Sequence, residues 1–570
     1  MLKGLLYRKL VAKKKERHAK HSLDLPAIKF KRVSKFIEIT RPDDITKTNI
    51  TYPIMEPYVY VNIKYDKDKN ELVYNVVEPE LTEDEKERLK LIKEGLIDLI
   101  DIDPSAIKDE SKLLKYLIPL VKRVMKELRI DISQESFMKI MYYIYRDFAG
   151  YNEIDPLLND PNIEDISCDG VGIPIYIVHR VFGSLKTNIV FKNKDDLRKL
   201  IVKLAQRSGR YVTYAEPILE ASLPDGSRVS ATIAEDVATR GPTFTIRKFT
   251  EKPFSPIELI ELNTGNFEIF AYLWFLVEHR TSALIIGGVA SGKTSLLNSL
   301  GIFIPPEAKI VSIEDTRELR FVHEHWVPTL SRVGFGIPLA TGGKYGEVSL
   351  FDLLRESFRQ NPDYVIVGEA RGKETYVMFQ GMASGHASLS TFHAGSVDAL
   401  VKRLISPPIE LPPMLIESLD LVITMIRAKE KSKSARRIRE IVEIIGVDPD
   451  TKSVMKNVVF RWDSYNDKYI KVNDSKKIQE ICDRIGMKYE DALKEIERRR
   501  KVLEWLYKIG KKSYEDVARF ITLYYKDPEA VMQMVKKGIM EEKEIQDIVK
   551  LIIKRNPVLE KLGFISIVEK

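Results

Sequence analysis

Residues 281–295 read TSALIIGGVASGKTS, an apolar run that passes into a glycine-rich turn. The run at 283–286 predicts a short buried strand, and the apolar residues from Leu296 onward predict a helix. Between them, the spacing Gly287-x-x-x-x-Gly292-Lys293-Thr294 matches a phosphate-binding loop. Such glycines let backbone N–H groups turn inward around phosphates, and the helix N-terminus adds partial positive charge. The stretch therefore predicts a nucleotide site on an α/β sheet.

The loop supplies the expected ligands of the nucleotide. Lys293 would reach the β- and γ-phosphates and the Thr294 hydroxyl would coordinate Mg²⁺, so ATP and Mg²⁺ are the expected cofactors. Chance would produce this spacing in on the order of a few per cent of chains this long, and the strand-to-helix context lowers that figure. We expect phosphate contacts from the whole loop: Gly287, Gly288, Val289, Ala290, Ser291, Gly292, Lys293, Thr294 and Ser295.

Two apolar runs further along the chain end in carboxylates. KIVSIEDT at 309–316 includes Glu314, and DYVIVGEAR at 363–371 includes Glu369. In a parallel sheet, ligands bind beyond the carboxyl ends of the strands, so both acids should converge on the nucleotide. One carboxylate can orient or deprotonate the attacking water, and the other can hold Mg²⁺ through water.

Two histidines lie in the stretch GHASLSTFHA, residues 385–394. The spacing from His386 to His393 is not a zinc pattern such as H-E-x-x-H, so we expect no metal site from them. Two interpretations stay open. They are satisfied structural histidines, or they hydrogen-bond to the γ-phosphate or to the water network around it.

Basic residues are concentrated at the N-terminus. The net charge is +8, and residues 1–36 hold twelve Lys or Arg against two acids. This segment is either a solvated, mobile tail or a tail attracted to anionic lipid headgroups, at about 1 kcal/mol per basic residue near the surface. Nucleic-acid binding is disfavoured, because the rest of the chain is close to neutral and offers no second basic face.

Composition limits the remaining possibilities. A length of 570 residues suggests three or four domains. Cys168 and Cys482 are the two cysteines, and their separation indicates ordinary thiols in a reducing compartment. The longest apolar stretch, around Phe267 to Val277, is shorter than the ~20 residues of a membrane span, and no signal peptide is recognisable. We expect a cytoplasmic protein unless a partner holds it elsewhere.

Changes of pattern along the chain predict its organisation. Alternating apolar residues at 58–78 predict a β-hairpin, and Thr82 with Glu85 forms a T-x-x-E capping box that opens a helical stretch. Short strands and one helix, near Leu197 to Ser208, follow from residue 150. The predicted segments are a basic tail (1–50), a hairpin plus helical adaptor (51–149), an α+β lobe (150–252), a linker (253–266), an α/β domain (267–473) and a helical extension (474–570).

Taken together, these ordered motifs resemble those of the secretion ATPase superfamily, which powers type II secretion, type IV pili and archaeal surface filaments. The core motifs are GxxxxGKT, IEDTxE, RESFRQNPDYVIVGEAR and GHASLSTFHA. DPLLNDPNIEDISCDG at 155–170, LPDGSRVSATI and GPTFTIRKF resemble the archaeal branch that includes the archaellum motor. The resemblance covers about residues 55–445 and implies a RecA-like ATPase core preceded by a smaller α+β lobe.

The resemblance also implies roles for individual residues. It makes Glu314 the general base, places Glu369 where phosphate-loop enzymes often have Asp, and assigns His386 and His393 to a histidine box. It further matches three arginines to lobe residues that face nucleotide across a domain or subunit boundary, where a permanently charged planar fork stabilises phosphoryl transfer. These three, for which surface ion pairs are the alternative, are Arg228, Arg240 and Arg247. Arg359 and Arg371 are expected to pair with nearby carboxylates instead.

The departures from the family pattern are mild. Asn361 stands where arginine is common, and Ser295 and Ser384 replace the more usual threonines. The tetracysteine module of the bacterial type II members is absent, which favours the archaeal branch. The catalytic set is complete, so an active enzyme is expected.

The expected function is therefore a homo-hexameric, Mg²⁺-dependent ATPase at the inner face of the cell membrane. It would drive a pilus, an archaellum-type filament or protein secretion through a polytopic membrane platform protein. Two alternatives stay open. A RecA-type nucleic-acid translocase predicts stimulation by single-stranded nucleic acid, and an ATP-binding scaffold predicts no turnover.

Overall fold

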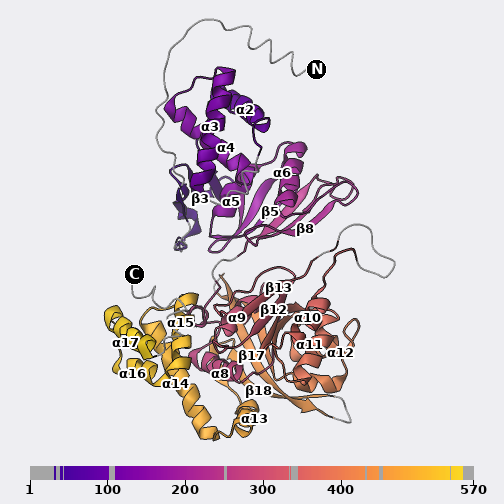
Figure 1. Ribbon diagram of the computed structural model, residues 1–570, viewed down its shortest axis with the longest axis vertical. Helices are drawn as coiled ribbons and strands as arrows, with labels where there is room; N and C mark the ends of the chain where they lie inside the picture. Colours follow the sequence, from indigo (N-terminus) through magenta and orange to yellow (C-terminus); the bar gives the residue numbers. More distant parts are fainter. Residues whose placement is uncertain are drawn as a thin grey trace. The chain divides into compact units, whose positions relative to one another are not determined.

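The computed structural model describes residues 31–33, 37, 39–42, 44–101, 110–249, 253–332, 334, 344–430, 433–448, 453–539 and 541–555. The chain divides into two compact units, Met1–Phe249 and Thr250–Lys570 (Figure 1). Most of the predicted basic tail, residues 1–30 and 34–36, lies outside the described residues, so its attraction to lipid stays a prediction.

Unit 1 combines a long sheet with helices. Among its described residues the sheet has ten strands, in the order β1-β2-β3-β4-β7-β6-β5-β10-β9-β8. Its elements are β1 (Lys31–Arg32), η1 (Ile45–Lys47), β2 (Asn49–Glu56), β3 (Val59–Asp66), β4 (Glu71–Val77), α2 (Glu83–Ile97), α3 (Glu110–Leu128), α4 (Gln134–Phe148), η3 (Asn152–Ile154), α5 (Asp155–Asn159), β5 (Ile163–Cys168), β6 (Pro174–His179), β7 (Gly183–Val190), α6 (Lys194–Arg207), β8 (Ile218–Ser222), β9 (Arg228–Thr232) and β10 (Thr243–Arg247).

The local predictions for unit 1 are confirmed. β3 and β4 form the hairpin, and Ile63 lies opposite Tyr74, so that the alternating apolar residues share one buried face. Thr82 accepts a hydrogen bond from the backbone N–H of Glu85, and the Glu85 carboxylate accepts one from the backbone N–H of Thr82, which completes the capping box of α2. The helix expected near Leu197 to Ser208 is α6, and the lobe also contains the short helix α5.

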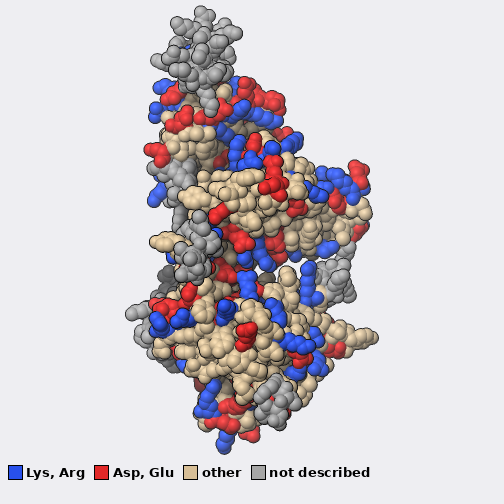
Figure 2. Space-filling model, turned by 90° about the vertical axis from the view of Figure 1, so that its right-hand side faces the viewer, with Lys and Arg blue, Asp and Glu red and all other residues tan. Residues whose placement is uncertain are grey.

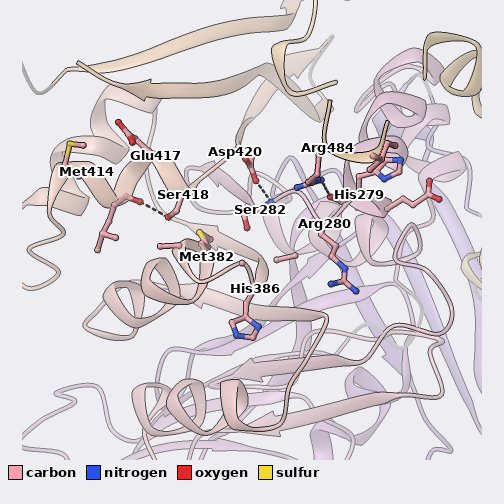
Figure 3. A pocket seen from close by; sticks show the side chains of 16 residues that line it. His279, Arg280, Ser282, Met382, His386, Met414, Glu417, Ser418, Asp420 and Arg484 are labelled. Carbon is pink, nitrogen blue, oxygen red and sulfur yellow. Dashed lines mark hydrogen bonds between the residues drawn. The ribbon is translucent and has the colours of Figure 1, made fainter. Parts of the chain in front are cut away.

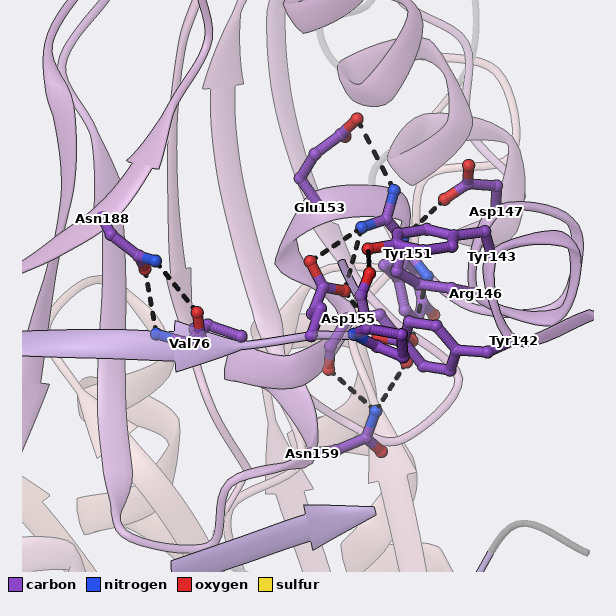
Figure 4. Close-up of polar contacts among 12 residues, drawn as sticks. Val76, Tyr142, Tyr143, Arg146, Asp147, Tyr151, Glu153, Asp155, Asn159 and Asn188 are labelled. Atoms are coloured by element: carbon purple, nitrogen blue, oxygen red, sulfur yellow. Dashed lines mark hydrogen bonds and ion pairs between the residues drawn. The ribbon is translucent and has the colours of Figure 1, made fainter. Parts of the chain in front are cut away.

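The predicted adaptor and lobe form one unit rather than two domains. β4 pairs in parallel with β7, which makes the sheet continuous, and one hydrophobic cluster includes side chains from both segments. Asn188 on β7 extends this pairing, because its amide accepts from the Val76 N–H and donates to the Val76 carbonyl, both at 2.9 Å (Figure 4). The sequence did not reveal this pairing because the two strands are more than 100 residues apart.

A buried arginine connects the end of α4 to the residue that follows β4. Arg146 donates to both carboxylate oxygens of Glu78, at 2.9 and 3.1 Å, and to Asp147 at 2.7 Å (Figure 4). Its guanidinium also lies 4.8 Å from the centre of the Tyr143 ring. Burial lowers the pKa of Arg146 but the two carboxylates raise it further, so the net pKa is well above its usual value. This network holds the helical adaptor rigidly against the strands.

Unit 2 is a three-layer α/β structure whose sheet has nine strands among the described residues, in the order β13-β12-β14-β15-β11-β16-β17-β18-β19. Its elements are α7 (Pro256–Glu261), α8 (Phe267–Glu278), β11 (Ala283–Gly287), α9 (Lys293–Gly301), β12 (Ile310–Glu314), β13 (Trp326–Leu330), α10 (Leu350–Arg359), β14 (Tyr364–Ala370), α11 (Glu374–Ala383), β15 (Ala387–Phe392), α12 (Val397–Ile405), η4 (Pro413–Ser418), β16 (Leu421–Glu430), β17 (Lys433–Val447), β18 (Val454–Asp463), β19 (Lys468–Lys471), α13 (Lys476–Ile485), α14 (Tyr489–Lys508), α15 (Tyr514–Lys526), α16 (Pro528–Lys537) and α17 (Glu542–Arg555).

Helices cover both faces of this sheet. From β13 to β16 neighbouring strands are parallel, and β17, β18 and β19 then add antiparallel pairs. Successive strand residues point to opposite faces, so Ile285 belongs to the cluster with α8, α9 and the C-terminal helices, whereas Leu284 and Ile286 belong to the cluster with α10 to α12 (Figure 1). This is the predicted α/β domain.

The predicted linker and C-terminal extension are both part of unit 2. Ile257 of α7, within the expected linker, is fully buried in the same hydrophobic cluster as α8. Trp274 of α8 stacks on Phe303, packs edge-on against Tyr524 and donates to the Tyr525 hydroxyl at 2.9 Å. The helices after residue 474 therefore complete the core of the α/β domain. In the described residues, every helix falls short of the length or the apolarity that crossing a bilayer requires.

Candidate nucleotide-binding site

The glycine-rich stretch forms the predicted turn between a strand and a helix. β11 ends at Gly287, and α9 begins at Lys293 with Gly292 as its N-cap at a φ of +94°. Glycine adopts this left-handed conformation without a steric penalty. The backbone N–H groups at the start of α9 have no partner within the helix, and they point toward the space where an anion would bind.

Gly287 allows β16, the neighbouring strand in the sheet, to lie close to the end of β11. A Cβ atom at residue 287 would come within 2.4 Å of the Met425 carbonyl oxygen and 2.6 Å of the Ser291 hydroxyl. At Gly288, a Cβ atom would meet nothing within 4 Å. The two neighbouring glycines therefore differ sharply in the room that a side chain would have.

This difference predicts the effect of alanine substitutions. Gly287→Ala should lower the free energy of unfolding of unit 2 by about 1–3 kcal/mol, because the added methyl group forces β16 away from β11. Gly288→Ala is the matched control and should leave thermal unfolding unchanged. Calorimetry of the two variants without nucleotide would check this, and equal melting temperatures would contradict it.

Lys293 lies within the loop and is almost fully buried. Its Nζ donates to the carbonyl oxygens of Gly287 at 3.2 Å and Gly288 at 2.9 Å. The same ammonium group lies 3.5 Å from Nδ1 of His393, whose Nε2 lies 2.9 Å from a carboxylate oxygen of Glu369. The loop lysine, the second histidine and the second predicted glutamate thus form one contiguous cluster.

His393 is held neutral in this cluster. Its pKa is lowered from the usual value, first by burial and then by the charge of Lys293, although the Glu369 carboxylate acts in the opposite direction. Arg403 of α12 donates to the His393 carbonyl oxygen and fixes the backbone after β15. A neutral imidazole donates one hydrogen bond and accepts one, and here both ring nitrogens have a partner: Lys293 at Nδ1 and Glu369 at Nε2.

Glu314 ends β12, and its two carboxylate oxygens have different surroundings. One carboxylate oxygen accepts the backbone N–H groups of Glu318 and Leu319, both at 2.8 Å. The other oxygen is buried and has no hydrogen-bond partner among the described residues. Burial raises the pKa of Glu314 to about 7, against the opposing effect of the two N–H groups. Such a carboxylate can accept a proton near neutral pH.

The residues present fit Mg²⁺ and ATP on two counts. The loop offers backbone N–H groups with a buried ammonium, which suits a polyphosphate, and Glu314 has an unsatisfied oxygen that a water molecule could satisfy. Thr294 and Ser295 follow Lys293 on the first turn of α9, so the Thr294 hydroxyl is the side-chain oxygen that would hold Mg²⁺. Glu369 would contribute to the Mg²⁺ shell through water.

His386 lies away from this cluster. It directly precedes β15, whereas His393 directly follows that strand, so the two histidines lie at opposite ends of β15. His386 packs against Phe358, with ring centroids 5.0 Å apart, and lines a cavity of about 730 Å³ (Figure 3). The structure thus places His386 at the end of β15 opposite to the phosphate loop, and its contact with the γ-phosphate stays a prediction. A spacing of seven residues spans a six-residue strand, which the motif alone could not show.

The predicted arginines of unit 1 separate into a pair and a single residue. Arg228 on β9 lies directly opposite Arg247 on β10, and both are exposed. Arg247 also lies 4.0 Å from a carboxylate oxygen of Asp165. Arg240 precedes β10 and is thus at the other end of that strand, where its carbonyl oxygen accepts the Val171 N–H. A single anion could contact Arg228 and Arg247 together, but Arg240 is positioned for a separate contact.

Of three further arginines in unit 2, two contact residues at the site, namely Arg371 and Arg436. Arg371 pairs with Asp315, the residue after Glu314, as the sequence predicted for a structural partner. Arg359, the other arginine expected to pair, lies 3.9 Å from Glu356 in a weak exposed contact. Arg436 on β17 donates through Nε to the Ala290 carbonyl oxygen at 3.3 Å. No local sequence pattern indicated a role for Arg436. This residue is nearly 150 residues from the loop, and only the order of strands in the sheet brings the two together.

A phosphate loop between a parallel strand and a helix, with acids at neighbouring strand ends, defines the class of phosphate-loop nucleotide-binding proteins. The profile of the family described as Type II/IV secretion system protein matches residues 174–512, and that described as PilB3-like, N-terminal, matches residues 7–80. The chain belongs to the type II/IV secretion system protein family, which confirms the resemblance inferred from its motifs.

Individual relatives agree with this assignment. An uncharacterized protein of Methanocaldococcus jannaschii is 34% identical over 515 residues, which is 86% of this chain and 90% of the relative. The type IV secretion system protein PtlH of Bordetella pertussis is 29% identical over 280 residues, 43% of this chain and 80% of PtlH.

Two solved structures of ATPases also align with parts of the chain. The ATPase DotB of Legionella pneumophila is 17% identical with a TM-score of 0.35, covering 69% of this chain and 93% of DotB. The VirB11 ATPase of the Brucella suis type IV secretion system is 22% identical with a TM-score of 0.26, covering 52% of this chain and 93% of VirB11.

Proposed function

We propose that the protein is a Mg²⁺-dependent ATPase that works as a homo-hexameric motor. It drives the assembly of a pilus or archaellum-type filament, or type II-like secretion, through a polytopic membrane platform protein. The observation that carries the proposal is the cluster at the carboxyl ends of the parallel strands, where Lys293, Glu369 and His393 are in contact and Glu314 ends the next strand. Membership of the secretion ATPase family supports the motor role.

Each residue of the proposed site has a separate role in ATP hydrolysis. Lys293 and the loop N–H groups bind and orient the phosphates, and Glu314 accepts the proton of the attacking water. His393, which lies between Lys293 and Glu369, has one N–H and would donate it to the γ-phosphate or to the water network in place of Glu369. Bound Mg²⁺, held by Thr294 and through water by Glu369, would neutralise charge on the β- and γ-phosphates. The family resemblance assigns Arg228, Arg240 and Arg247 to the stabilisation of negative charge in phosphoryl transfer, and two of them, Arg228 and Arg247, lie opposite each other on β9 and β10.

Turnover should depend on pH through Glu314. The raised pKa of this carboxyl, about 7, means that the base form is lost as the pH falls below neutrality. We expect kcat to rise with pH and to reach half its plateau near pH 7. His393 does not account for this rise of kcat with pH, because its pKa is lowered below its usual 6.5. A kcat profile that is flat from pH 5.5 to 8.5 would contradict Glu314 as the base.

Phosphate release by the purified protein tests the proposal directly. The wild type should release phosphate from Mg²⁺-ATP, and Lys293→Ala should abolish both release and ATP binding. Vesicles of phosphatidylglycerol should stimulate the wild type more than vesicles of phosphatidylcholine, through the basic N-terminus. Failure of the wild type to turn over ATP, with and without vesicles, would leave the scaffold alternative.

The nucleic-acid translocase is the second candidate, and the charge on the face shown in Figure 2 disfavours it. On the face shown in Figure 2, basic and acidic side chains are interspersed over the described residues of both units. A translocase would need a basic track for the phosphate backbone. Stimulation of turnover by single-stranded DNA that exceeds stimulation by anionic vesicles would favour it over the secretion motor.

A further inference from the structure

The hairpin formed by β16 and β17 extends past the phosphate loop. β16 pairs in parallel with β11 as far as Gly287, which lies opposite Met425, and then continues to Glu430. The register of β16 against β17 shifts between Thr424 and Met425, at the point where β11 ends. Such bulges re-aim the side chains that follow them. The outer part of the hairpin therefore lies beside the loop rather than beside another strand.

Arg436 lies across the loop at this position. A Cβ atom on Gly292 would approach the Arg436 Cδ to 3.0 Å and its Cγ to 3.7 Å, so the aliphatic part of the arginine lies on the N-cap of α9. Its Nε donates to the Ala290 carbonyl oxygen at 3.3 Å. Within the described residues, the two terminal guanidinium nitrogens of Arg436 make no hydrogen bond, and the side chain is exposed.

The adjacent residue explains why Arg436 is held in place. Arg437 points to the other face of β17, where it is buried and donates to both carboxylate oxygens of Asp467, at 2.8 and 2.9 Å. It also donates to the Leu262 carbonyl oxygen at 3.0 Å. These contacts anchor β17 to the rest of unit 2, so that Arg436 is presented to the loop by a fixed strand.

We propose that Arg436 is a second basic side chain of the nucleotide site, and that its guanidinium binds the phosphates of the nucleotide beside the loop. The inference rests on the proposed function, because it assumes that the loop binds ATP. Its only described acceptor is a neutral carbonyl, and charge-assisted hydrogen bonds to phosphate are about twice as strong as neutral ones. Arginine also presents a planar fork that matches two phosphate oxygens at once.

This contact differs from the role of Lys293. The lysine is buried inside the loop and follows the loop glycines in sequence, whereas Arg436 approaches from the hairpin, over Gly292 and Ala290. Residue 292 therefore has two reasons to be glycine: its left-handed backbone and the close approach of the arginine. Phosphate binding in this protein thus depends on the β16–β17 hairpin as well as on the loop.

Isothermal titration of the full-length chain with Mg²⁺-ATP tests the inference. Arg436→Met keeps an unbranched side chain over Gly292 but removes the charge, and Arg436→Lys keeps the charge but lacks the fork. Arg439→Met, at an exposed residue of the same strand, is the matched control. We expect Arg436→Met to weaken ATP binding about tenfold or more, Arg436→Lys to restore part of the loss, and the control to bind as the wild type does.

Inorganic pyrophosphate identifies the part of the nucleotide that is bound. In competition with ATP it should lose affinity in Arg436→Met by a factor similar to that for ATP, since it carries phosphates but no base or ribose. Unchanged ATP affinity in Arg436→Met, or weakened ATP binding with unchanged pyrophosphate binding, would overturn the inference. A wild type that fails to bind ATP would instead refute the proposed function itself.

Discussion

Replacing Glu314 by glutamine is expected to lower kcat for ATP hydrolysis by about 10²–10⁴-fold, while ATP still binds. The factor is that of a lost general base. Glutamine keeps an oxygen that can accept the N–H groups of Glu318 and Leu319, so the local backbone should be retained. Single-turnover phosphate release and titration with Mg²⁺-ATP would separate the loss of chemistry from any loss of binding.

The same substitution should change the pH dependence of stability. The folded pKa of Glu314, about 7, is above its unfolded value of 4.5, so the native state holds this proton more tightly. The contribution of this carboxyl to the free energy of unfolding is fully present below pH 4.5, and it is lost as the pH rises to about 7. Glu314→Gln removes that decrease, and we expect the variant to be at least as stable as the wild type above pH 7.

Glu318→Gln provides the control for both measurements. Glu318 is exposed; its backbone N–H donates to the Glu314 carboxylate and its charge makes only a smaller contribution to the raised pKa of Glu314 than burial does, so its side chain should be dispensable for turnover. Two results would refute the assignment of Glu314. One is a Glu314→Gln variant with more than a tenth of wild-type turnover, and the other is an equal loss in Glu318→Gln.

Glu443→Ala is expected to destabilise unit 2 by about 3 kcal/mol or more, because it leaves several buried donors without an acceptor. The Glu443 carboxylate is fully buried on β17 and joins α8, β18 and the start of α13. It accepts the Tyr272 hydroxyl at 2.7 Å, the Asn457 amide at 2.9 Å, the Lys476 N–H at 2.8 Å, the Lys477 N–H at 3.4 Å and the Ser475 hydroxyl.

The position of Glu443 explains the size of this effect. A negative charge at the N-terminus of α13 interacts favourably with the partial positive charge of that helix end. Denaturant unfolding of Glu443→Ala, compared with Glu440→Ala on the same strand, would measure the loss. If the two variants unfold at the same denaturant concentration, Glu443 does not connect the C-terminal helices to the sheet.

Local patterns were sufficient for the elements of the core. The glycine loop, the acids at the ends of β12 and β14 and the capping box of α2 are all encoded within a few residues, so their geometry follows from backbone rules. The position of His386 relative to the phosphate loop could not be predicted from a local pattern. Its motif is contiguous, but a strand places its two ends far apart, and only the length of β15 decides which histidine reaches the loop.

Domain boundaries depended on contacts that no local pattern contains. The hairpin at 58–78 and the helices that follow it are predicted from sequence to form an adaptor separate from the lobe, yet β4 pairs with β7 and merges the two. The helices after residue 474 are amphipathic and could cover any apolar surface. Two side chains of the α/β domain determine where these helices pack. Trp274 on α8 contacts the Tyr525 hydroxyl, and Glu443 on β17 accepts a hydrogen bond from Ser475 at the start of α13.

The sequence by itself determined the phosphate loop, the two acidic strand ends, the parallel α/β core and the family, because each is written in short, ordered motifs. The tertiary structure alone decided that His393, and not His386, joins Lys293 and Glu369, and that Arg436 lies over the loop. The physical reason is that sheet order and strand length bring together side chains that are distant in the chain, and neither quantity appears in the spacing of residues.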